Sequence, residues 1–183
     1  MTTLQERVAN ERRRLRTIRQ KMMAAVERKS AGDESYVPFY VASADYIDAT
    51  MQRLHEQDVK MGEKIREKAD EVEDDIETAL GHLEGRLRGA KEHLKPFLAA
   101  RDELKEKGAA ALEQFEKKAK EYSDFIVANM GHHGASSDLS AKLFTLADWE
   151  YMAGVTDEEV EKEENLFERA AACTPDSVKH ISD

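Results

Sequence analysis

The chain has 183 residues, of which 40% are hydrophobic and 36% are charged, with only three prolines and nine glycines. This composition is sufficient for a hydrophobic core and favours long helices, and no segment shows the alternation of Val, Ile and Thr typical of β-strands. The formal net charge of −10 disfavours a general nucleic-acid binder, and we do not expect a nucleic-acid partner.

Neither a membrane span nor a secretory signal is evident in the sequence. No stretch approaches the roughly 18 apolar residues of a membrane span, and the N-terminal segment lacks the apolar region of a secretory signal. Cys173 is the only cysteine, which fits a reducing compartment. The sequence therefore predicts a cytoplasmic protein without a membrane partner.

The first predicted helix, from Leu4 to Arg28, is basic. Residues 1–29 contain nine Arg or Lys and only three Glu, so a basic helix precedes an acidic body. Two interpretations are open: the helix binds an anionic partner, or "RRRLR" is solvated or packs near the acidic run at residues 67–77.

The second and third predicted helices, near residues 38–72 and 74–106, carry the clearest hydrophobic periodicity. Each has apolar residues in rows of seven-residue period that predict a buried seam. Pro96 lies inside the third segment, so one helix or two shorter ones are both possible.

The fourth predicted helix, at about residues 109–131, begins after Gly108, and the phase of its apolar face continues to His133. Short segments follow, in which Ser137 or Asp138 can cap a helix and "TLAD" and "TDEE" resemble capping boxes.

The predicted fold is therefore all-α: an antiparallel helical bundle resembling a four-helix bundle, with an extra N-terminal helix and short C-terminal helices. We expect a basic helix at residues 1–29, the bundle at residues 36–172 and a loose tail at residues 173–183.

Several polar residues occupy core or boundary positions of these helices, where a charge without a partner is costly. Asp58, His133 and Glu164 lie on apolar faces, whereas His55 and His93 lie at their edges and can tilt inward. Together with Asp138 and Glu163 they form a candidate constellation for a di-iron or di-manganese centre. The alternative is a buried hydrogen-bonded network that fixes helix register without metal.

Three stretches resemble bacterial hemerythrin-like proteins, also called cation-binding HHE proteins. They are "LHEQDVKMGEKI" (54–65), "KEHLKPFLAARDEL" (91–104) and "FEKKAKEYSDFIVANMGHHGASSDLSAKLFTLADWEYM" (115–152). The spacing of His133 and Asp138 matches the family's His-x-x-x-x-Asp element, and His93 stands in a ligand place.

The resemblance implies a helical bundle with a non-haem iron site that serves oxygen binding, iron handling or redox sensing. The implied metal ligands are His55, Asp58, His93, His133, Asp138 and Glu164. Asp58 stands where the family has a histidine, and Ser136 and Ser137 stand where it has acids. A di-iron site, a mononuclear iron or manganese site, or no metal at all therefore remain open.

The competing hypothesis is a metal-free interaction or scaffold protein. Its long second and third helices would pair with a second copy, giving a homodimer, or with a partner helix, and the basic first helix would be the docking arm. We do not expect an enzyme, because the sequence shows no phosphate-binding loop and no activated nucleophile.

Overall fold

The protein is all-α, as predicted. A computed structural model describes residues 4–28, 32–69, 74–129 and 134–181, and within these ranges it has no β-strand. The elements, in chain order, are α1 (Leu4–Glu27), η1 (Glu34–Tyr36), α2 (Val37–Lys68), α3 (Asp74–Lys107), η2 (Gly108–Ala111), α4 (Leu112–Asn129), α5 (Gly134–Leu143), α6 (Leu146–Met152), α7 (Asp157–Ala172) and η4 (Asp176–Val178).

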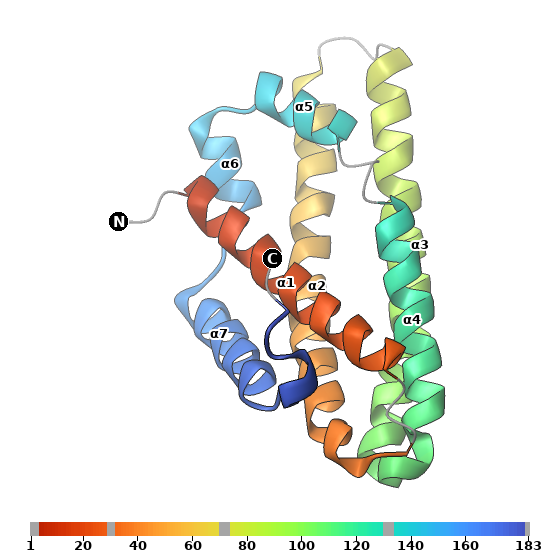
Figure 1. Ribbon diagram of the computed structural model, residues 1–183. Helices are drawn as coiled ribbons and strands as arrows, with labels where there is room; N and C mark the ends of the chain where they lie inside the picture. Colours follow the sequence, from red (N-terminus) through yellow and green to blue (C-terminus); the bar gives the residue numbers. More distant parts are fainter. Residues whose placement is uncertain (1–3, 29–31, 70–73, 130–133, 182–183) are drawn as a thin grey trace.

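Helix α3 runs antiparallel to both α2 and α4, so α2 and α4 point in the same direction, and α1 crosses these three long helices obliquely on one face (Figure 1). The shorter α7 packs along α2, while α5 and α6 lie at the opposite end of the molecule (Figure 1). Helix α1 contacts α2, α4 and α7 and buries Ile18, Met22 and Ala25, so this basic segment is part of the packed body.

The core has two parts. The larger one lies where α1, α2, α3, α4 and α7 meet, and Phe39, Tyr40, Phe97 and Phe115 are fully buried there. The smaller one joins the far ends of α2 and α3 to α6, and includes Met61, Ile65, Leu83 and Met152. Most members of the predicted seven-residue rows are buried, among them Ile47, Met61, Leu83 and Leu104.

Local signals fix several helix boundaries as predicted. Capping boxes begin α6 at Thr145 and α7 at Thr156, each with the side chain of the third helical residue bonded back to the cap. Gly108 separates α3 from α4 with a φ of +56°, a conformation that glycine adopts readily. Pro96 lies on the exposed face of a single continuous α3, where water can solvate the carbonyl that loses its backbone partner.

Two sequence-based expectations differ from the structure. Ser137 and Asp138 lie inside α5, which begins at Gly134, so neither caps a helix. Residues 173–181, expected to form a loose tail, place Val178 in the larger core, and the Thr174 hydroxyl donates to the Ala170 carbonyl at 3.0 Å.

Among the described residues, no helix is long and apolar enough to cross a membrane.

Candidate functional site

Asp58, the carboxylate predicted on the apolar face of α2, forms an ion pair with Arg86 of α3. The Arg86 Nη2 donates to the Asp58 Oδ2 at 3.0 Å, and the two side chains are 7% and 18% exposed. Burial raises the pKa of Asp58, and this effect is opposed by the nearby charges of Arg86, Arg12 and His55. Asp58 therefore has a cationic partner that ties α2 to α3.

The two predicted histidine ligands of the long helices have different surroundings. His55 is half-buried one helical turn before Asp58. The ring of His93 stacks on Phe125 of α4, with 4.2 Å between ring centroids, and its Nδ1 lies 2.9 Å from the Gly89 carbonyl oxygen. Gly89 has no side chain, which leaves the space that the Phe125 ring occupies.

The other predicted ligands are distributed over the molecule. Asp138 is exposed on α5, and Glu164 on α7 accepts from Arg14 of α1 at 3.0 Å. Glu164 is 48% exposed at its side chain, whereas the neighbouring Glu163 is 13% exposed. The expectation that Glu164 lies in core phase was therefore wrong by one residue, and His133 lies outside the described residues.

Of the six predicted ligands, the structure brings His55 and Asp58 close together, while His93, Asp138 and Glu164 lie in separate environments. In the part of the chain that the structure describes, no group of three or more His, Cys, Asp or Glu side chains could hold a metal ion.

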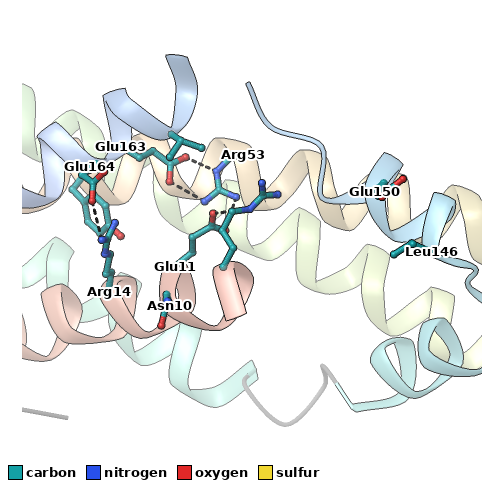
Figure 2. A pocket seen from close by; sticks show the side chains of 11 residues that line it. Asn10, Glu11, Arg14, Arg53, Leu146, Glu150, Glu163 and Glu164 are labelled. Carbon is teal, nitrogen blue, oxygen red and sulfur yellow. Dashed lines mark hydrogen bonds and ion pairs between the residues drawn. The ribbon is translucent and has the colours of Figure 1, made fainter. Parts of the chain in front are cut away.

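A buried arginine that the sequence analysis missed lies at the junction of three helices (Figure 2). Arg53 of α2 donates to both carboxylate oxygens of Glu163 on α7, at 2.5 and 2.8 Å, and to Glu11 on α1 at 3.0 Å. Burial is the largest single effect on the Arg53 guanidinium, and it lowers the pKa. The hydrogen bonds and charges of Glu163 and Glu11 together outweigh burial, so the pKa of Arg53 is raised. A cleft of about 460 Å³ adjoins this cluster, and its charges are largely paired with one another.

A groove of about 320 Å³ between α1, α2 and α4 has a different balance of charge. Its lining includes Arg12, Arg16 and Arg19 of α1, together with the carboxylate of Asp58. The remaining lining side chains are apolar and come from all three helices: Leu15, Met51, Leu54 and Ile126.

The three arginines of this groove have few partners of opposite charge. Arg19 donates to the Ser123 hydroxyl at 3.1 Å. Burial lowers the pKa of Arg19; Tyr122 opposes this effect and Arg16 adds to it. Arg12 and Arg16 are exposed and form no ion pair with any residue that the structure describes. The groove therefore combines apolar side chains with an excess of positive charge, three arginines against one carboxylate.

No protein-family model matches this chain, and no curated protein or solved structure matches it either. The resemblance to hemerythrin-like proteins therefore stays a prediction, and the function is inferred from the geometry alone.

Proposed function

We propose that this chain is a helical interaction protein that binds an acidic segment of another protein in the groove between α1, α2 and α4. The observation that carries the proposal is the charge of that groove: three arginines line it together with a single carboxylate, Asp58, which already pairs with Arg86. An acidic partner would supply the missing negative charge.

The apolar floor gives this groove a source of affinity besides charge. Leu15, Met51, Leu54 and Ile126 are each only partly buried, so a partner side chain placed over them would remove further apolar surface from water. The net charge of the whole chain, −10, opposes long polyanions, which favours a short acidic protein segment over nucleic acid.

Fluorescence anisotropy with a labelled peptide of about 20 residues, rich in Glu and Leu, tests the proposal. The full chain is expected to bind with an affinity that falls as salt is raised, because exposed charges are screened. The R12E/R16E variant should lose at least about tenfold in affinity, since repulsion replaces attraction at the groove.

The matched control is R13E/R28E, which changes two exposed arginines of the same N-terminal region that do not line the groove. It makes the same change in net charge and should retain nearly the original affinity. Absence of binding by the unmodified chain at low salt, or an equal loss in both variants, would contradict a site in this groove.

A hemerythrin-like metal centre is the second proposal, favoured by one pair of residues. His55 and Asp58 are one turn apart on α2, and the imidazole acts on the pKa of the buried carboxyl. Iron content after anaerobic reconstitution tests this proposal: near-stoichiometric iron that is lost in H55A/D58N supports it. Iron content at background in the unmodified chain, with its helical circular dichroism intact, rejects it.

A further inference from the structure

Resting on the proposed function, we infer that the acidic segment is bound as an amphipathic α-helix that lies along α1, with one row of carboxylates facing the arginines. The groove arginines follow one another at positions 12, 16 and 19, which is the i, i+4, i+7 spacing of one helix face. At 1.5 Å per residue this row is about 10 Å long. Carboxylates at the same spacing on a second helix would form a matching row.

The apolar floor has the form of a helix-packing surface. Met51 and Leu54 are three residues apart on α2, Leu15 lies on α1 beside Arg16, and Ile126 comes from α4. Side chains at this spacing form ridges between which the side chains of another helix can pack. A ligand helix with apolar residues at i, i+3 or i+4 and i+7 would place them over this floor.

The walls of the groove also distinguish a helical ligand from an extended one. An extended segment leaves its backbone N–H and C=O groups unpaired, and it usually binds at the edge of a β-sheet. The walls here are α1, α2 and α4, whose backbone groups are used within each helix. A ligand that satisfies its own backbone groups therefore fits this groove better.

Two labelled peptides of identical composition test the helical ligand. One places Glu at i, i+4, i+7 and Leu on an adjacent face, and the other alternates the same residues with a period of two. We expect the first peptide to bind at least about tenfold more tightly and to gain helical circular dichroism on binding.

Variants of the floor provide a second readout. M51A/L54A shortens two half-buried side chains of the groove, and it should weaken the helical peptide while leaving the alternating peptide unchanged. V127A/L146A is the matched control, because these two side chains are exposed and do not line the groove. Thermal unfolding of each variant verifies that it remains folded.

The outcomes separate the two levels of the proposal. If both peptides bind equally and R12E/R16E abolishes the binding of both, the proposal of an acidic partner is supported and the inference of a helical ligand is wrong. If neither peptide binds, both are wrong.

Other occupants of the groove have their own readouts. If vesicles containing phosphatidylserine bind as tightly as the helical peptide, and R12E/R16E abolishes that binding, the ligand of the groove is a lipid surface and not a protein helix. Sedimentation of the unmodified chain as a dimer that R12E/R16E converts to a monomer would show that a second copy occupies the groove, and either result overturns the inference.

Discussion

Arg53 and Glu163 lie 110 positions apart in the sequence and form a two-point ion pair in which both side chains are largely buried. A guanidinium and a carboxylate that meet through two parallel hydrogen bonds fix orientation as well as distance. Because Glu11 accepts a third hydrogen bond from the same arginine, α1, α2 and α7 share one polar junction.

Removal of this arginine is expected to destabilise the fold strongly. In R53A, Glu163 would stay in a largely buried position without its cation, and Glu11 would keep only the ion pair with Arg7 at 3.6 Å. We expect a loss of about 3–5 kcal/mol in the free energy of unfolding. Urea denaturation followed by circular dichroism measures it. The control is R14A, which removes the exposed Arg14–Glu164 pair and the contact of Arg14 with the Phe167 ring, and should cost no more than about 1–2 kcal/mol. Equal losses in the two variants would show that burial of the junction has no consequence.

The contact between Gly89 and Phe125 predicts that an added methyl group is destabilising. A Cβ at position 89 would lie 2.5 Å from the Phe125 Cζ, so the ring would have to leave its stack on His93. We expect G89A to lose about 1–3 kcal/mol in the free energy of unfolding, as overpacked sites do. G85A is the control one turn away: nothing lies within 4 Å of its added Cβ, and alanine should stabilise this helix by about 0.5–1 kcal/mol. A stabilised G89A would disprove the close helix contact.

Asp148 predicts a specific dependence of stability on pH. Its hydrogen bonds to Lys68 and then to the Thr145 side chain and backbone hold the pKa of this carboxyl well below its usual range. A carboxyl whose pKa is lower in the folded state stabilises the fold above its unfolded pKa of about 3.9, and this contribution is lost as the pH falls below that value.

The variant D148N should therefore unfold more easily than the unmodified chain near neutral pH, and the difference should shrink as the pH is lowered below about 4. Urea midpoints across this range provide the measurement. D138N is the control, since the Asp138 side chain is exposed and forms no ion pair or hydrogen bond with the residues that the structure describes. A difference between D148N and the unmodified chain that stays constant with pH would contradict the assignment.

Val178 predicts that the C-terminal segment contributes to stability. Its side chain is fully buried in the larger core, so V178A should lose about 1–3 kcal/mol from two buried methyl groups and the remaining space. V127A removes the same atoms from a valine that is 53% exposed and should change stability by less than about 0.5 kcal/mol. Identical melting temperatures for V178A and the unmodified chain would restore the loose tail that the sequence predicted.

Much of the fold was predictable because it depends on local signals and on apolar periodicity. The seam between α2 and α3, the capping boxes at Thr145 and Thr156, and the break at Gly108 follow from residues close together in the sequence. The sequence does not decide between one helix and two at Pro96, because the choice depends on whether that proline faces solvent.

The polar junction was not predictable from the same patterns. Helix α2 is buried on a second face, where Ser43, Tyr46, Thr50, Arg53 and Gln57 contribute. These side chains are mostly polar, so a search for apolar rows does not detect the face. Its burial depends on α7, which is distant in the sequence.

The candidate metal ligands show the same limit. Asp58 was correctly expected to need a partner, yet the sequence could not indicate that Arg86 would supply it. On α7, Val160 and Phe167 are compatible with rows through either Glu163 or Glu164, and only the packing of α7 on α2 selects Glu163.

The long separation between Arg53 and Glu163 also has a consequence for synthesis on the ribosome. Helices α1 and α2 are translated before α7, and the carboxylate that completes their shared junction follows Arg53 by 110 residues. Until then Arg53 has only Glu11 as a carboxylate partner in this junction, so the packing of α1 on α2 would remain incomplete. Final assembly of this region must therefore wait until α7 has left the ribosome, as expected for folds that depend on contacts distant in sequence.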